Sequence, residues 1–425
     1  MTWFLLQGLL RDRSRSLFPL IVTAVGVLLT VFVYSFIQGE LYGIITSNAD
    51  FHTGHVKVVT RAYAARMDQA PNDLVLLGIS ELQEDLSRAF PDIRWTPRTF
   101  FGGLLDIPDD QDETRAQGPA AGMAVNLLNP SSEEIDRLDI RGGLVKGRLP
   151  ERPFEILVSD EFARDLGLDV GKQATLISSG MYGGMAMQNF EVAGTVHFGV
   201  QAMDRGGLIA DISGIQTALN MEDGAGELLG YFRDGRYTKE RVNAVVDRFD
   251  KLYGSEEGEF VPTMLKLTDQ NDLDSMLAYV DVVSGIMVII FILVMSIVLW
   301  NAGLMGTLRR YGEYGVRLAI GEDKGHIYRT LITESLMIGF TGSVVGTVLG
   351  LGASYFMQAH GIDIGDLMGN ATMLIPDVIR ARVTTGSYYV GFFPGFGATT
   401  LGAMIAGFGI YKRETASLFK ELEVQ

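Results

Sequence analysis

The sequence predicts a membrane protein with four transmembrane α-helices and a large α+β domain inserted between the first and second helices. Three observations support this fold class: four apolar windows, a long polar stretch after the first window, and basic residues gathered in short loops. The windows cover about residues 17–37, 280–305, 331–357 and 388–411. Each is long enough to cross the hydrocarbon core of a bilayer as a helix.

The charges of the short loops predict the orientation of these helices. The arm before the first window has three Arg, the 306–330 loop has five Lys or Arg, and the tail after residue 411 has three. The 358–387 loop has only Arg380 and Arg382. Because basic loops stay in the cytoplasm, both termini and the 306–330 loop should be cytoplasmic. The first window lacks a small-residue cleavage site, so we expect an uncleaved anchor rather than a signal peptide.

The chain therefore divides into nine predicted segments. They are an amphipathic cytoplasmic elbow helix at 1–16, transmembrane helices at 17–39, 277–305, 331–357 and 388–411, an outer domain at 40–276, a cytoplasmic loop at 306–330, an outer loop at 358–387 and a cytoplasmic tail at 412–425.

The outer domain alternates short strand-like and helical runs, which is typical of an α+β fold. The strand-like runs are 55–60, 93–107, 123–128, 154–158, 174–177, 190–197, 207–210 and 228–232. Helices are predicted at 160–166, ended by Gly167, and at 238–253, ended by Gly254. The second helix should bury one apolar stripe, made of Val242, Val245, Val246, Phe249 and Leu252. Ser80 and Ser131, each followed three residues later by Gln or Glu, predict capping boxes. The acidic stretch 109–119 predicts a mobile loop.

Composition excludes several classes of function. Residues 40–276 hold 22 basic and 39 acidic residues, a formal charge of −17, which argues against nucleic acid as a partner. The chain has no Cys, so disulfides and thiol chemistry are excluded. The 167–172 segment lacks the spacing and the Ser or Thr of a phosphate loop. His52 and His55 lie near Asp50, but a structural role fits them better than a metal site. No catalytic constellation stands out, so we expect a non-enzyme.

Residues 301–321 and 327–335 carry a family resemblance. They read NAGLMGTLRRYGEYGVRLAIG and IYRTLITES, and they join two apolar windows through a basic loop. This pattern resembles the FtsX/MacB/LolC-LolE family of ABC-transporter permeases. Residues 147–150 and 155–176 resemble the strand–helix–turn–strand unit of the MacB-like periplasmic domain. Residues 54–58, GHVKV, are similar to the strand that opens the outer domain in LolC/LolE-like permeases.

The resemblance implies a non-catalytic permease subunit in the bacterial inner membrane, with its large domain in the periplasm. Its implied partners are a separate ABC ATPase, which would hold ATP and Mg, a second permease (the same chain or a paralogue), membrane lipid, a lipoprotein substrate and a periplasmic carrier. The chain itself would hold no cofactor. Lipoprotein release is the function that the resemblance favours. MacB-like export of a peptide or drug with a periplasmic adaptor, and FtsX-like activation of a cell-wall hydrolase, are the alternatives.

The resemblance also implies two sets of site residues. A coupling helix in the 306–330 loop would contact the ATPase through Arg317, Gly321, Glu322, Asp323, Lys324, Ile327, Tyr328 and Glu334. A substrate groove would be lined by Phe32, Tyr34 and Phe36 of the first helix and by Met287, Ile290, Phe291 and Met295 of the second. Arg309, Arg310 and Arg317 could instead pair with lipid phosphates. Residues 181–187, rich in Gly and Met, are a candidate contact for a carrier or the tip of a flexible hairpin.

Small residues recur at every fourth position in the last two windows. The third window has Gly342, Gly346, Gly350 and Ser354, and the fourth has Ser387, Gly391, Gly395, Thr399, Ala403 and Gly407. Because small side chains let helix backbones approach closely in lipid, these positions predict a helix-packing seam.

Overall fold

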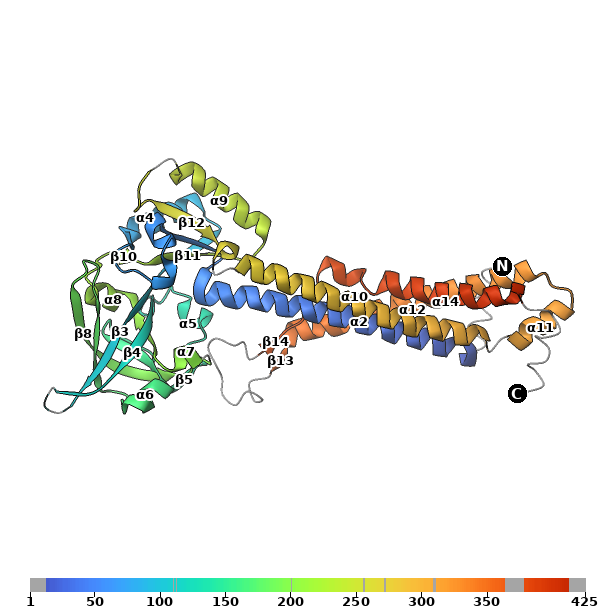
Figure 1. The fold of residues 1–425 in the computed structure, drawn as a ribbon, viewed down its shortest axis with the longest axis horizontal. Coiled ribbons are helices and arrows are strands. Elements are labelled where there is room, and N and C mark those ends of the chain that lie inside the picture. Colours follow the sequence, from blue (N-terminus) through green and yellow to red (C-terminus); the bar gives the residue numbers. More distant parts are fainter. Residues whose placement is uncertain are drawn as a thin grey trace. The chain divides into compact units, whose positions relative to one another are not determined.

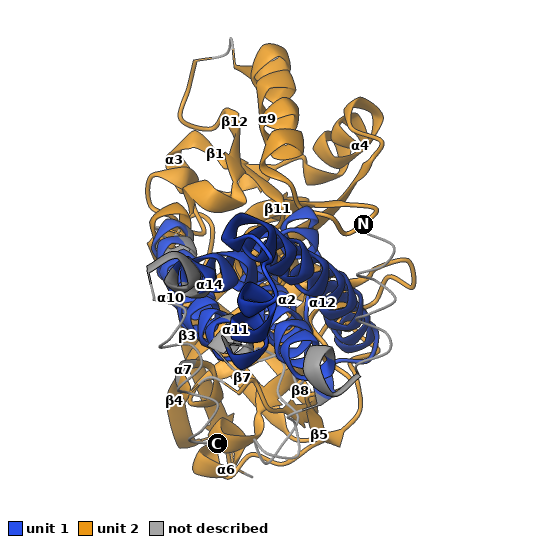
Figure 2. Cartoon of the chain, turned by 90° about the vertical axis from the view of Figure 1, so that its right-hand side faces the viewer, with its two compact units in different colours: residues 1–43, 277–362, 379–425 blue, residues 44–276, 363–378 orange. Residues whose placement is uncertain are grey.

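The computed structural model describes residues 13–109, 111, 113–199, 201–254, 257–270, 273–308, 311–363 and 378–412. The chain forms two compact units (Figure 2). Unit 1 comprises Met1–Gly43, Leu277–Ile362 and Ile379–Gln425, and unit 2 comprises Ile44–Met276 and Asp363–Val378.

Long helices dominate unit 1 (Figure 1). They are α2 (Arg13–Asn48), α10 (Leu273–Leu308), α11 (Tyr311–Ala319), α12 (Lys324–His360) and α14 (Phe392–Lys412), with the 3-10 helix η4 (Thr385–Tyr388) before α14. The short strands β13 (Ile362–Asp363) and β14 (Val378–Ile379) pair after α12. Both α2 and α10 are longer than the transmembrane helices predicted for them. Helix α12 begins seven residues before its predicted start, so the 306–330 loop is largely helical.

Three helices in the described part of the chain are long and apolar enough to cross a membrane. Their candidate spans are Leu17–Thr53, Leu273–Val298 and Lys324–His360. These correspond to the first three predicted windows. The fourth window forms α14, which is not among the three candidate spans, so a fourth transmembrane helix stays a prediction.

The small residues of α12 and α14 form the predicted packing seam. A Cβ atom added at Gly346 would lie 2.4 Å from the backbone oxygen of Ala24 in α2, and one added at Gly395 would lie 2.3 Å from Val27. Ser35 donates a hydrogen bond to the hydroxyl of Ser387 at 3.0 Å. Because α2 packs directly against the glycines at these positions, any larger side chain would force α2, α12 and α14 apart. The seam prediction is confirmed.

Unit 2 is built on a ten-stranded mixed sheet. Its order is β12-β1-β11-β3-β4-β9-β6-β8-β5, and β7 pairs with both β3 and β8. The strands are β1 (Val56–Thr60), β3 (Ile93–Pro108), β4 (Thr114–Val125), β5 (Leu144–Gly147), β6 (Glu155–Ser159), β7 (Gln173–Ser179), β8 (Met185–Val196), β9 (Gly207–Asp211), β11 (Glu227–Phe232) and β12 (Pro262–Lys266); β2 (Leu76–Leu77) and β10 (Gly224–Ala225) form a separate pair.

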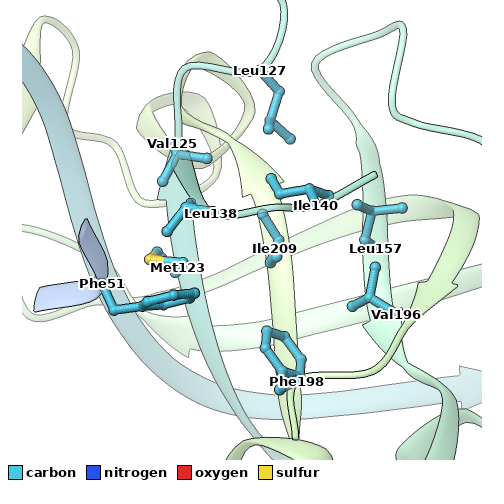
Figure 3. Packing of buried hydrophobic residues seen from close by; sticks show 10 residues of the cluster. All are labelled: Phe51, Met123, Val125, Leu127, Leu138, Ile140, Leu157, Val196, Phe198 and Ile209. Atoms are coloured by element: carbon cyan, nitrogen blue, oxygen red, sulfur yellow. The ribbon is translucent and has the colours of Figure 1, made fainter. Parts of the chain in front are cut away.

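Short helices connect these strands. They are η1 (Ala49–Thr53), α3 (Arg61–Ala64), η2 (Met67–Gln69), α4 (Ile79–Ala89), α5 (Glu134–Arg137), α6 (Asp160–Leu166), α7 (Gln201–Asp204), α8 (Ile212–Ala218), α9 (Lys239–Tyr253) and η3 (Leu267–Asp269). The hydrophobic core of one lobe gathers side chains from β4, β6, β8, β9 and the segment around α5, together with Phe51 of η1 (Figure 3). Burial of Phe51 in this core fixes η1 to the sheet.

Each of the eight predicted strand runs of the outer domain overlaps a strand, although β4 ends at Val125 rather than at 128, and both predicted helices form as α6 and α9. Gly167 ends α6 with φ +63°, as expected for a left-handed cap. Leu252 is an exception on α9, because it is 52% exposed rather than on the buried stripe.

Two local predictions are wrong. The loop prediction at 109–119 fails from Thr114 onward, where β4 pairs with β3 in a long hairpin. The capping boxes also fail: α4 begins at Ile79, before Ser80, and the hydroxyl of Ser80 donates to Asp223 instead. The N-cap residue of α5 is Glu133 rather than Ser131. At both places the structure depends on contacts between residues far apart in the sequence, which a local pattern does not reveal.

Candidate functional site

A helical hairpin in unit 1 occupies the region where the coupling helix was predicted. α11 ends in a Schellman motif: the amide of Glu322 donates to the carbonyl of Arg317 at 3.0 Å, and that of Gly321 to Leu318 at 3.1 Å. Gly321 has φ +100°, a conformation that favours glycine. Asp323 then caps α12, because its carboxylate accepts from the amide of Gly325 at 2.9 Å. The chain thus reverses within four residues.

A bidentate ion pair closes this turn. Nε and Nη2 of Arg317 donate to the two carboxylate oxygens of Glu322, each at 2.6 Å. This pairing raises the pKa of Arg317 and lowers the pKa of Glu322, so both stay charged at neutral pH. His326 lies 3.6 Å from the same carboxylate. Two of the charges predicted to face an ATPase, Arg317 and Glu322, therefore pair with each other within the hairpin.

The two faces of the hairpin differ in burial. Tyr314, Ile327 and Leu331 form a small apolar cluster, with Leu318 packed against it, and Ile327 has no exposed surface. On the other side, Ile320 at the turn is 81% exposed and Val316 is 43% exposed. Val316 and Ile320 therefore lie on the exposed side of the hairpin, and Ile327 on its buried side.

The predicted coupling residues divide into three groups in this geometry. Arg317, Gly321, Glu322 and Asp323 shape the turn, and Lys324 begins α12. Ile327 and Tyr328 face inward: Tyr328 packs on α14, where its hydroxyl donates to the carbonyl of Met404 at 3.4 Å. Glu334 lies half-buried further along α12. Contact of any of these with an ATPase stays a prediction, but Ile327 has no surface to offer. The sequence analysis did not single out Ile320, whose exposure becomes visible only in the folded turn. Arg309 and Arg310 lie outside the described residues.

The predicted groove residues do not all share one face. Met287, Phe291 and Met295 follow one another at four-residue spacing on α10, and Ile290 lies beside them; Met287 and Ile290 are 60% and 55% exposed. On α2, Phe32 and Phe36 share a face, but Tyr34 lies on the other side and packs against Gly386. Tyr34 therefore lies on a different side of α2 from the other two. The groove itself stays a prediction.

A buried charged network in unit 2 holds the segment that follows α2. Arg98 of β3 is fully buried, and its Nη1 donates to the carbonyls of Asp50 and Phe51 at 2.9 and 2.7 Å. Its Nη2 donates to Glu134, also fully buried, at 2.6 Å. Arg137 pairs with the other oxygen of Glu134 and lies 3.6 Å over the ring of Tyr231. The guanidinium of Arg98 satisfies carbonyls that the end of a helix leaves open.

The two histidines near this network have structural roles. His55 is 7% exposed, and its Nδ1 accepts a hydrogen bond from the amide of Phe232 at 3.0 Å. Burial lowers the pKa of His55 to about 4. His52 stacks on Phe100 with ring centroids 6.0 Å apart. Within the described residues, no group of three or more His, Asp or Glu could hold a metal ion.

Comparisons with known proteins show similarity to permeases in the C-terminal part of the chain. Residues 285–415 match the family described as FtsX-like permease C-terminal. A curated relative from Chromobacterium violaceum, "Macrolide export ATP-binding/permease protein MacB", is 22% identical over 316 residues, which cover 68% of this chain and 47% of that protein. The protein of the same name from Brucella abortus is 30% identical over 117 residues, 28% of this chain and 17% of that protein.

The chain thus spans less than half the length of the curated relatives that it matches. Among solved structures, the periplasmic region of MacB from Actinobacillus actinomycetemcomitans covers 54% of this chain and 94% of its own, at 14% identity and a TM-score of 0.36. Residues 285–415 are thus similar to FtsX-like permeases, and about two thirds of the chain is similar to a MacB protein at 22% identity.

Proposed function

We propose that the chain is the permease subunit of an ABC transporter in the bacterial inner membrane, driven by a separate ATPase that binds the α11–α12 hairpin. Two permeases, identical or paralogous, would act with two ATPases, and ATP and Mg would be held by the ATPases alone. The work would be done on a substrate at the outer leaflet or in the periplasm. The observation that carries this proposal is the hairpin within the FtsX-like segment 285–415.

The hairpin has the properties that a mechanical contact needs. The Arg317–Glu322 pair and the Schellman turn make its tip rigid, and the cluster around Ile327 fixes α11 to α12. Ile320 at the tip would enter an apolar depression on the ATPase. Because the tip is rigid, a displacement of the ATPase would move α12 as a whole rather than bend the turn.

Lipoprotein release is the substrate assignment that we favour. In this proposal the permease extracts lipoproteins from the outer leaflet and passes them to a periplasmic carrier, with the apolar stripe of α10 at Met287, Phe291 and Met295 against the acyl chains. Soft thioether and aromatic side chains suit such a ligand. The GHVKV strand at residues 54–58, which resembles the LolC/LolE type, adds to this support.

An exposed apolar surface on unit 2 could receive the carrier. Leu104 of β3, Ile177 of β7 and Met187 of β8 are cross-strand neighbours on one face of the sheet. Met187 is 61% exposed, and Met185 and Tyr182, at the tip of the β7–β8 hairpin, are 79% and 83% exposed. Exposed Met and Tyr side chains adapt well to an apolar partner.

Drug or peptide export is the second candidate, and the curated relatives favour it because each is named a macrolide export protein. The same unit 2 surface would then bind an adaptor. Activation of a cell-wall hydrolase, as in the FtsX branch, is the third possibility, and it predicts no transported substrate.

Purification from native membranes in mild detergent, followed by mass spectrometry of the retained proteins, tests these assignments. An ATPase with acylated lipoproteins supports release, and peptide sequences identical or different from this chain identify the second permease. An ATPase with an adaptor or a hydrolase, and no lipoprotein, favours the corresponding alternative. Absence of any ATPase would contradict the permease proposal itself.

A further inference from the structure

The exposed apolar surface of unit 2 contains two neighbouring methionines. Met185 and Met187 are two residues apart on β8, so their side chains lie on the same face of the sheet. Met187 is the cross-strand neighbour of Ile177 on β7, and Ile177 is the neighbour of Leu104 on β3. Met185 stands opposite Ser179, next to the tip of the hairpin. The two thioethers therefore form one end of a largely apolar row that solvent can reach.

The other methionines of unit 2 whose burial the structure describes are shielded from solvent. Three are at most 5% exposed: Met123, Met221 and Met264. Three more are half-buried: Met67, Met181 and Met203. Because the oxidation of a thioether follows its exposure, an oxidant in solution reaches Met185 and Met187 before the other described methionines of unit 2.

The reaction at these thioethers is a reversible oxygen transfer. The chain has no Cys, so no thiol of its own competes with them for an oxidant. With hydrogen peroxide, the sulfur gains one oxygen atom: an S–O bond forms, the O–O bond breaks, and the second oxygen leaves as water. The sulfur is oxidised by two electrons and the peroxide is reduced. A methionine sulfoxide reductase reverses the step, because two of its thiols become a disulfide and the oxygen leaves as water.

Oxidation at this place changes the surface and leaves the fold intact. The ladder between β7 and β8 is made by backbone groups, and Ala186, between the two methionines, faces the interior. A sulfinyl oxygen is a hydrogen-bond acceptor, so covering it with an apolar partner that has no donor is unfavourable. The same oxygen on Met123 would enter the hydrophobic core. The burial of the other methionines therefore directs oxidation to a site where it alters binding rather than folding.

We propose that Met185 and Met187 form a reversible oxidation site that controls binding at this face of unit 2. In the thioether form the row accepts an apolar partner, and in the sulfoxide form it does not. The oxidant is hydrogen peroxide or another small peroxide that reaches the domain from solution. The chemistry of the site stands on unit 2 alone, whereas the control of binding rests on the docking surface under the proposed function.

Peptide mass spectrometry of the whole chain in detergent, after a series of hydrogen peroxide doses, tests the oxidation site. Sulfoxide should form at Met185 and Met187 at least about tenfold faster than at Met123 and Met264, because only the first two are exposed. A methionine sulfoxide reductase with a thiol reductant should then restore both thioethers in the folded protein. Equal rates at the exposed and buried methionines, or sulfoxides that the reductase does not reduce, overturn the proposal.

Photo-crosslinking in intact cells, from a benzophenone amino acid in place of Leu104, tests the control of binding. The yield of products with other proteins should fall at least about threefold after a pulse of peroxide, because the sulfoxides disfavour an apolar contact. In the double variant Met185→Leu with Met187→Leu, which keeps the apolar volume and removes both sulfurs, the yield should not change. Met264→Leu is the matched control, because Met264 is buried, and it should respond like the wild type.

The failures of the two proposals are distinguishable in this experiment. If products form but their yield ignores peroxide, or falls equally in the double variant, the control of binding is wrong and the docking surface stands. If position 104 gives no product with or without peroxide, the docking surface is wrong, and the control of binding fails with it.

Discussion

Arg317 and Glu322 join the end of α11 to the start of α12 through two hydrogen bonds of 2.6 Å. The pair spans the turn at Gly321, so it fixes the angle at which the two helices meet. Because both side chains are only about 30% exposed, the pair is held in one geometry more firmly than a flexible surface ion pair.

Loss of this pair should loosen the hairpin without unfolding the protein. Arg317→Gln or Glu322→Gln should cost about 1 kcal/mol or less of stability, because partly exposed pairs contribute little. Hydrogen exchange at the amides of Gly321 and Glu322 should become faster, and ATP hydrolysis by the complex should lose its response to substrate. The double variant Arg317→Glu with Glu322→Arg restores opposite charges and should recover part of both effects. If the single variants behave like the wild type in exchange and coupling, the pair has no mechanical role.

Ile320 and Ile327 should respond in opposite ways to truncation. Ile327→Ala removes a fully buried side chain and should lower the free energy of unfolding by roughly 2–5 kcal/mol. Ile320→Ala removes a side chain that is 81% exposed, so it should leave the melting temperature nearly unchanged while weakening ATPase association at least about tenfold. Melting temperature and affinity measured on the same preparations check this, and an Ile320 variant that binds normally would contradict the contact.

The helix seam should be sensitive to a single methyl group at Gly346. A Cβ there would lie 2.4 Å from the backbone oxygen of Ala24, so Gly346→Ala should force α12 from α2 and lower thermal stability in detergent. Gly352 lies on the same helix with nothing within 4 Å, so Gly352→Ala is the matched control and should be neutral or slightly stabilising. Similar melting temperatures for the two variants would show that the helices do not meet at Gly346.

Arg98 should be among the least replaceable residues of unit 2. Arg98→Met leaves Glu134 buried with less compensation and removes the guanidinium donor from the carbonyls of Asp50 and Phe51, so it should cost about 3–5 kcal/mol. Arg88→Met, on the surface of α4, should change stability by less than about 0.5 kcal/mol. Chemical denaturation of both variants provides the comparison, and a cost for Arg98→Met as small as that of the control would sink this interpretation.

His55 should make unit 2 less stable in acid. Its pKa in the folded state is about 4, against 6.5 for the free side chain, because burial disfavours the charged ring. The unfolded state therefore binds a proton first as pH falls, and stability is lost between about pH 6.5 and pH 4. Asp50 works in the opposite direction, because burial raises its pKa to about 6, so its protonation adds stability as pH falls through 6.

His55→Asn keeps an acceptor for the amide of Phe232 but removes the titrating ring. Its melting temperature should fall less steeply than that of the wild type between pH 6.5 and pH 4. Asp50→Asn should remove the opposing contribution and steepen the fall. A His55→Asn variant with an unchanged slope would show that His55 does not carry this acid sensitivity.

Local sequence signals predicted much of the fold. Gly167 ended α6 as expected because only glycine readily adopts its positive φ, and the spacing of Val242, Val246 and Phe249 gave α9 and its buried face. The glycines at every fourth position of α12 predicted the seam, because two helices pack closely only where small residues line the contacting face.

Features that depend on distant partners were not predictable in this way. Arg98 and Glu134 are 36 residues apart, and nothing local to either one signals a buried pair. From the sequence, Glu322 was predicted to be a surface charge that contacts a partner, whereas in the structure the turn places it against Arg317. The first residues of β4 follow an acidic stretch and include Gly and Pro, so they look like a loop, and they form a strand because β3 offers them a matching edge.

Photo-crosslinking from position 320 in native membranes tests the central claim most directly. With a benzophenone amino acid in place of Ile320, the account predicts a crosslinked product that contains an ABC ATPase, and its yield should fall when Glu322 is replaced by Gln. The same probe at Val345, an exposed position midway along α12, should give no such product. If position 320 crosslinks only to lipid, or to no ATPase under conditions where the complex is active, the hairpin is not the ATPase contact and the proposed mechanism is wrong.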